Sequence, residues 1–110
     1  MEINVKQVKE ITLVELAGRI DGRTAPQVEA EITPLIEPGC KIVLDMTRVD
    51  YLSSAGLRTL IMAQREVSGG GGQLALAGLM ARVRDTMSIT GFLPFFTTYA
   101  SVEMALAALR

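Results

Sequence analysis

The first twenty residues alternate loosely between hydrophobic and polar positions, which is typical of β-strands. Ile3, Val5 and Val8 predict a first short strand, and residues 11–17 predict a second, with a hairpin turn at 9–10. Two later apolar runs, 41–45 and 73–77, are continuous instead of alternating, as in strands that are buried on both faces. A short last strand is expected to end at about residue 99.

Hydrophobic residues at helical spacing fill the segments between these strands. The first such stripe consists of Ala25, Val28, Ile32, Leu35 and Ile36. Thr24 precedes this stripe and is followed by Pro26 in the first helical turn and by Gln27 at capping-box spacing, so we expect Thr24 to be the N-cap. Pro34 is expected to distort the last turn, and residues 38–39 to end the helix.

Three more helices are expected. One runs from about 54 to 67 and ends in the glycine-rich run 68–72, a composition typical of a flexible connector. The next carries Leu79, Val83, Met87 and Ile89 and ends near residue 91, and Ser101 caps a terminal helix. The resulting order ββαβαβαβα predicts an α/β fold in a single domain spanning residues 1–110. We expect about five strands in a mixed, mostly parallel sheet and about four helices, which cover substantially one face.

Composition excludes several classes of chemistry. The 110 residues include no histidine and one cysteine, Cys40, so a Ser-His-Asp triad is impossible and a zinc site is excluded in practice. The net charge of −1 comes without a basic run, which argues against nucleic-acid binding. No apolar stretch approaches the roughly 20 residues of a membrane span, and no signal peptide is visible. We therefore expect a cytoplasmic protein that is not an enzyme, needs no metal or cofactor, and carries a half-buried thiol at a strand start.

Ser53 and Ser54 occupy a short turn between a buried strand and a helix. Ligands and partners commonly approach an α/β sheet at this end of its strands. One serine could simply be an N-cap, worth about 1 kcal/mol. Alternatively, a phosphate on a serine here would meet the free N–H groups and the positive end of the helix dipole. The small side chains of Ala55 and Gly56 would leave room for a kinase or a partner.

Residues 49–58, Val-Asp-Tyr-Leu-Ser-Ser-Ala-Gly-Leu-Arg, resemble the signature turn of STAS domains, in particular the bacterial anti-sigma factor antagonists. Residues 18–24, Gly-Arg-Ile-Asp-Gly-Arg-Thr, look like the first loop of that family. The family's commonest turn is Asp-Ser-Ser/Thr-Gly-Leu. On this pattern Ser53 stands at the Asp, Ser54 falls on the phosphorylated serine, and Ala55 replaces the second hydroxyl. Gly56 and Leu57 match.

The resemblance implies a partner switch. The unphosphorylated protein would bind an anti-sigma factor that is also a GHKL-type serine kinase, phosphorylation of Ser54 would release it, and a PP2C-type phosphatase would reset the cycle. The expected partner surface consists of Asp21, Gly22, Arg23, Thr24, Ser53, Ser54, Ala55, Gly56, Leu57 and Arg58. Arg58 could instead be an ordinary solvated side chain. The protein is expected to be a monomer or weak dimer, and its output need not be a sigma factor.

Three alternatives remain on sequence grounds. A non-switching STAS adaptor, such as a subunit of a stress, secretion or lipid-transport complex, would use the same face without phosphate turnover. A small enzyme or an unrelated α/β binding module would give Ser54 no special role. The cluster of Phe92, Phe95 and Phe96 is expected to pack in the core, whereas an exposed member would indicate self-association.

Overall fold

The computed structural model describes all residues 1–110 and has one five-stranded sheet in the order β1-β2-β3-β4-β5. The strands are β1 (Glu2–Val8), β2 (Ile11–Ile20), β3 (Lys41–Leu52), β4 (Gln73–Ala77) and β5 (Thr97–Tyr99). The helices are α1 (Ala25–Ile32), α2 (Ser54–Gly69), α3 (Ala81–Ile89) and α4 (Val102–Leu109). β1 and β2 pair antiparallel and all other pairs are parallel, so the predicted fold class is confirmed.

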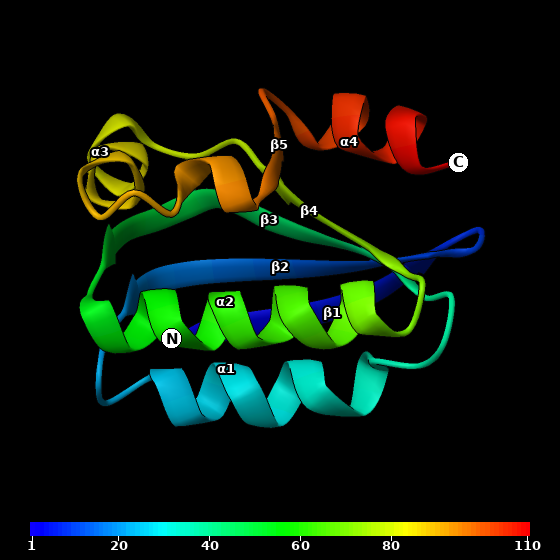
Figure 1. Cartoon of the computed structure of the whole chain (residues 1–110), viewed down its shortest axis with the longest axis horizontal. Helices are drawn as coiled ribbons and strands as arrows, with labels where there is room; N and C mark the ends of the chain where they lie inside the picture. Colours follow the sequence, from blue (N-terminus) through cyan, green and yellow to red (C-terminus); the bar gives the residue numbers. More distant parts are fainter.

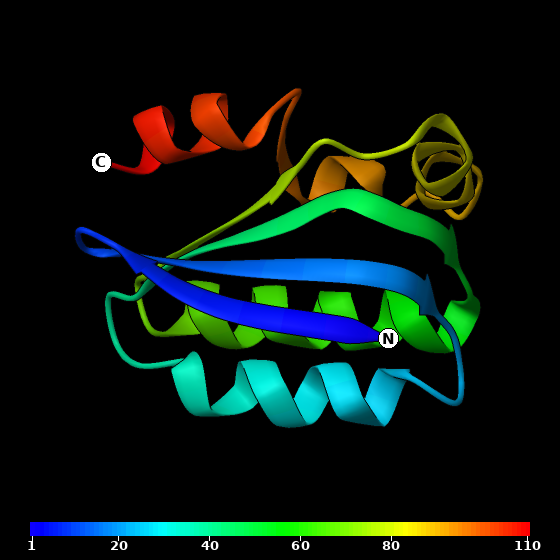
Figure 2. The ribbon, with the colours of Figure 1, turned by 180° about the vertical axis from the view of Figure 1, so that it is seen from behind.

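The two faces of the sheet are covered unequally. The larger hydrophobic core includes Val28 of α1, Leu60 of α2 and Val83 of α3, packed with the strands. The smaller one lies against α4, through Ala105 and Leu109. In Figure 1, α1 and α2 run side by side below the sheet while α4 lies above it. Seen from behind in Figure 2, β1 and β2 have no helix in front of them. The fold thus leaves the first residues of α1 and α2 together at one end.

Both strands that lead to this end are longer than the sequence predicts. β2 continues to Ile20 and β3 continues to Leu52, so residues 18–20 and 46–52 are strand and not loop. The polar residues of β3 hide the strand in the sequence because its pairing with β2 is irregular here. Glu15 pairs with Asp45, but Ala17, two residues on, pairs with Arg48, three residues on. At this irregularity, Asp45 accepts hydrogen bonds from the backbone N–H and the hydroxyl of Thr47 (3.0 and 2.7 Å).

The glycine-rich run after α2 is a packed turn and not a slack connector. α2 extends to Gly69, and Gly71 has a φ of 76°, a conformation that favours glycine. A Cβ on Gly72 would lie 2.5 Å from the carbonyl oxygen of Cys40, so glycine is required for this close approach. Cys40 is half-buried just before β3, as expected.

The two C-terminal helices match their predicted positions with one exception on α3. Val83 and Met87 are buried, but Ile89 is 86% exposed and Leu79 precedes the helix, so the predicted apolar stripe is shorter than expected. Ser101 caps α4, since its hydroxyl accepts a hydrogen bond from the backbone N–H of Met104 (3.2 Å). No helix in the structure combines the length and apolar character needed to cross a bilayer.

The phenylalanine cluster is only partly a core element. Phe96 is buried, whereas Phe92 and Phe95 are half-exposed and contact each other edge to face, with ring centroids 6.5 Å apart. The expectation that all three pack in the core is therefore wrong for two of them: the short 3-10 turn η2 (Leu93–Phe95), which contains Phe95, has no buried residue.

Candidate functional site

The two serines of the turn have different surroundings. Ser53 is the N-cap of α2: its hydroxyl accepts a hydrogen bond from the backbone N–H of Gly56 (3.2 Å), and its own N–H donates to the carbonyl of Ile20 (2.9 Å). Ser54 is the first residue of α2, is exposed, and makes no side-chain hydrogen bond within the chain. The structural role falls on Ser53, which leaves the hydroxyl of Ser54 free for chemistry.

Replacing Ser53 by Ala should lower the free energy of unfolding by about 1 kcal/mol, because the N–H of Gly56 loses its capping partner. Ser54→Ala should change it by less than about 0.5 kcal/mol, because the exposed hydroxyl has no partner to lose. Urea unfolding of both variants tests this division of roles. Equal effects of the two substitutions would contradict it.

Gly56 fixes the start of α2 against the end of β2. A Cβ at this position would lie 2.5 Å from the carbonyl oxygen of Ile20, 2.7 Å from its Cγ2 and 2.9 Å from Cδ1 of Leu52. Only glycine allows the helix to approach the two strand ends so closely. The exposed Ser54 is therefore held in place by the buried contacts of Gly56, two residues farther along the helix.

The loop between β2 and α1 is organised by Asp21. Its carboxylate accepts hydrogen bonds from the backbone N–H groups of Arg23 (3.0 Å) and Thr24 (3.2 Å), and its carbonyl accepts from the N–H of Ala25 (2.8 Å). Thr24 is the N-cap residue of α1, as expected, but the expected capping box does not form: its hydroxyl donates to the carbonyl of Arg19 (2.7 Å) and makes no bond to α1. Asp21 orders the start of α1 instead, because its short side chain reaches the N–H groups two and three residues farther along the chain.

The hydrogen bonds to its carboxylate lower the pKa of Asp21 below the ordinary value of 3.8, and the N–H of Arg23 is the largest cause. Because the pKa is lowered by folding, the stabilisation is present above the unfolded-state value and is lost as pH falls through the folded-state value. We expect the amide resonances of Arg23 and Thr24 to titrate together with a midpoint below 3.8. A midpoint at or above that value, measured by NMR, would contradict the proposed role of Asp21.

Arg19 and Tyr51 belong to the site although the sequence did not single them out. The guanidinium carbon of Arg19 lies 4.1 Å from the ring centroid of Tyr51, and Arg19 also forms an ion pair with Asp21 (3.8 Å). The contact joins neighbouring positions of β2 and β3, which pair in parallel. The two residues are far apart in the sequence, so the contact could have been predicted only if both strands had been extended to residues 19 and 51.

The predicted partner residues therefore meet at one end of the molecule. Residues 21–24 follow β2 and residues 53–58 follow β3, and the N–H of Ser53 bonds directly to the last residue of β2. In Figure 1 this end lies at the left, where α1 and α2 begin. Ser54, Ala55, Gly22, Arg23 and Arg58 are exposed, Asp21, Thr24 and Ser53 are half-buried, and Gly56 and Leu57 are buried. The last two support the surface instead of forming it.

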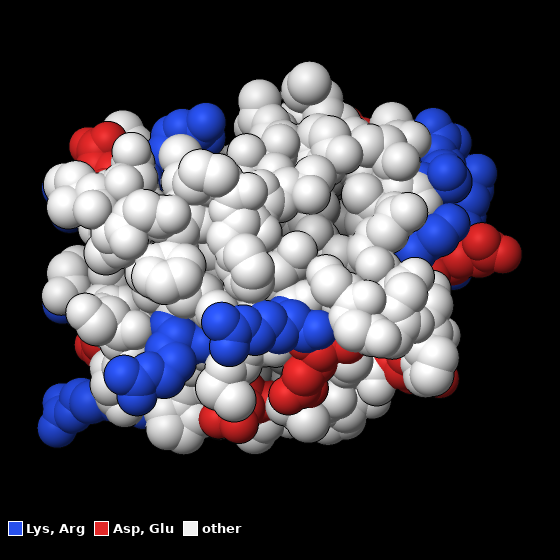
Figure 3. Space-filling model, in the orientation of Figure 1, with Lys and Arg blue, Asp and Glu red and all other residues white.

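Basic and acidic side chains are separated on the surface over α1 and α2. Lys and Arg side chains form a band over α2 in Figure 3, and Asp and Glu side chains lie below it toward α1. Arg58 and Arg65 of α2 are exposed, and neither forms an ion pair within the chain. The surface near Ser54 thus carries the unpaired guanidinium group of Arg58, and Arg65 lies farther along the same helix.

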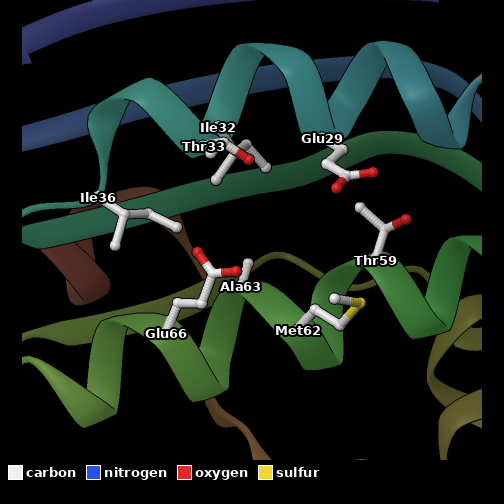
Figure 4. Close-up of a pocket in the computed structure, with 8 residues that line it drawn as sticks. All are labelled: Glu29, Ile32, Thr33, Ile36, Thr59, Met62, Ala63 and Glu66. Carbon is white, nitrogen blue, oxygen red and sulfur yellow. The ribbon is translucent and has the colours of Figure 1, made fainter.

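A cleft between α1 and α2 lies beside this surface but offers little room. Glu29 and Thr59 point toward each other across it, and Glu66 extends over it from α2 (Figure 4). Its volume is about 20 Å³, enough for roughly one water molecule. The cleft does not include either serine.

Comparison with known proteins gives a consistent result. The family model described as STAS domain matches residues 2–105. BtrV of Bordetella bronchiseptica, named as a candidate anti-sigma factor antagonist, is 33% identical over all of this chain and 96% of its own length. The anti-sigma-B factor antagonist of Bacillus subtilis is 32% identical over 83% of this chain and 84% of its own. An anti-sigma factor antagonist structure from Mycobacterium paratuberculosis superposes with a TM-score of 0.87 at 26% identity, covering 99% and 93% of the two chains.

Proposed function

Because the chain belongs to the STAS domain family, with anti-sigma factor antagonists among its relatives, we propose that it is the reversible binding partner in a phosphorylation-controlled switch. The observation that carries the proposal is the free, exposed hydroxyl of Ser54 at the first position of α2. The neighbouring Ser53 already satisfies the helix terminus, so Ser54 can be modified without loss of the cap.

In its unphosphorylated form the protein binds an anti-sigma factor that is also a GHKL-type serine kinase. The kinase transfers the γ-phosphoryl group of ATP to Oγ of Ser54, the hydroxyl proton leaves to a base of the kinase, and ADP departs with the kinase. A PP2C-type phosphatase later hydrolyses the phosphoserine. In this scheme the catalytic groups belong to the two enzymes, and this chain contributes the acceptor and its presentation.

The phosphate acts outward and not on the fold. Ser54 is exposed and lies at the N-terminus of the 16-residue helix α2, where a negative charge is favourable. The added charge of about −1.5 to −2 therefore strains nothing inside the chain but must be desolvated if a partner stays docked over it. Binding becomes unfavourable while the antagonist remains folded.

The contact surface in this proposal joins the exposed residues of the loop, Gly22 and Arg23, with Ser54, Ala55 and Arg58. Ser53 stands where the family's commonest pattern has Asp, and its hydroxyl is occupied by the cap. The acceptor therefore has no carboxylate as its immediate neighbour. We infer that the cognate kinase recognises a turn with less negative charge than the family's commonest turn, which carries an Asp before the phosphorylated serine.

Incubation with the cognate kinase and ATP, followed by mass spectrometry, tests the proposal. One phosphate on Ser54 is expected, and none on the Ser54→Ala variant. A phosphate mapped to Ser53, Thr47 or Thr59 would contradict the assignment. Stable binding of the kinase without any phosphate transfer would instead identify a non-switching adaptor.

A further inference from the structure

Ser54 and Arg58 occupy neighbouring positions on the exposed side of α2. They are four residues apart in one continuous helix, and both side chains are exposed. Residues at this spacing lie on the same helix face, with Cβ atoms about 5–6 Å apart. A phosphate on Oγ of Ser54 extends farther than the serine itself, so it comes within reach of the long arginine side chain.

Arg58 has no acidic partner in the unmodified chain. The three ion pairs of the structure join Lys6 to Glu15, Arg19 to Asp21, and Lys41 to Glu10. The first turn of α2 contains no acidic residue. An acid placed four residues before a base is the favourable order for a pair on a helix, and phosphorylation of Ser54 would create that order.

Several other charged groups lie on the elements around the turn. The carboxylate of Asp21 is bonded to loop amides and paired with Arg19, and Asp50 is an exposed residue of β3. Glu29 of α1 faces Thr59, which lies about 100° around the helix from Arg58. β4 has no charged residue. The exposed Arg23 of the neighbouring loop is the competing cation.

We propose that Arg58 is an internal phosphate-binding residue, whose guanidinium donates hydrogen bonds to the phosphate on Ser54. The inference rests on the proposed function, because it concerns the phosphorylated state. Planar guanidinium groups bind phosphate in a bidentate manner, which a flexible ammonium group does not reproduce. Phosphorylation would then have two effects on the partner surface: it adds a dianion, and it withdraws Arg58 from any acidic residue of the partner.

The test uses the isolated protein with phosphoserine installed at position 54 during synthesis, so it requires neither kinase nor partner. ³¹P NMR follows the second ionisation of the phosphate, whose ordinary pKa is about 6. Arg58→Gln is expected to raise that pKa by about 0.2–0.4 unit, because the dianion loses its cation. The phosphate pKa of Arg58→Lys should fall between those of the unsubstituted phosphoprotein and Arg58→Gln, since Lys keeps the charge but lacks the planar guanidinium group.

Arg65→Gln is the matched control, because Arg65 is exposed on the same helix but about 10 Å farther along its axis than Arg58. It should leave the phosphate pKa unchanged. The proposal is overturned if Arg58→Gln has no effect, or if Arg23→Gln carries the whole shift. Neither result would bear on whether Ser54 is phosphorylated or whether the phosphate releases a partner, so failure here leaves the proposed function to its own test.

Discussion

Replacing Ser54 by Asp is expected to weaken binding of the anti-sigma factor kinase by at least about 30-fold. A charge that is buried in a protein contact without a partner costs about 2–5 kcal/mol, and each 1.4 kcal/mol is a factor of ten in affinity. Ser54 is exposed in the free protein, so this cost arises only when the kinase docks over it. Isothermal titration calorimetry of the unmodified protein and of Ser54→Asp against the kinase measures this difference in affinity.

The matched controls for this variant lie at the same turn. Ser54→Ala adds no charge and should bind within a few-fold of the unmodified protein. Ser53→Asp adds the same charge one residue earlier, where Asp can still cap the helix, and should bind far better than Ser54→Asp. Unchanged affinity of Ser54→Asp would remove position 54 from the contact surface.

Gly56→Ala is expected to lower the free energy of unfolding by about 1–3 kcal/mol. In an unconstrained helix this substitution would stabilise by up to about 1 kcal/mol. Here the new Cβ would meet the backbone oxygen of Ile20 at 2.5 Å, and no side-chain rotation can relieve a contact with backbone. The clash therefore outweighs the propensity gain, and the helix must move away from the ends of β2 and β3.

Urea unfolding measures this effect, and Gly69→Ala is its control. Gly69 is in the same helix, but a Cβ there would have nothing within 4 Å. We expect Gly69→Ala to be neutral or slightly stabilising. If Gly56→Ala proved as stable as the unmodified protein, the close approach of α2 to β2 would not be what fixes the turn.

The order of strands and helices could be predicted because hydrophobic periodicity records it directly. The lengths of β2 and β3 could not. The polar residues after Asp45 suggest a loop, and only the parallel pairing of β3 with β2 shows that this stretch belongs to an irregular strand. Thr24 was predicted to form a capping box with Gln27, but Gln27 donates to the carbonyl of Met1 instead, a partner 26 residues away.

The candidate site could be predicted in part, because local patterns were again readable and contacts between strands were not. Its two segments are local motifs, and the structure brings both to one end of the sheet. The sequence left open which serine caps the helix, and the hydrogen bond from Gly56 to Ser53 answers that. The stacking of Arg19 on Tyr51 depends on the alignment of two strands, so no local pattern encodes it.

A phosphate on Ser54 is proposed to separate a complex that forms without it. The most direct measurement adds ATP to the preformed complex with the kinase and follows dissociation and phosphorylation together. The complex is expected to separate as phosphate accumulates on Ser54, while the complex of the Ser54→Ala variant persists. A phosphorylated protein that stays bound to the kinase would contradict this proposal.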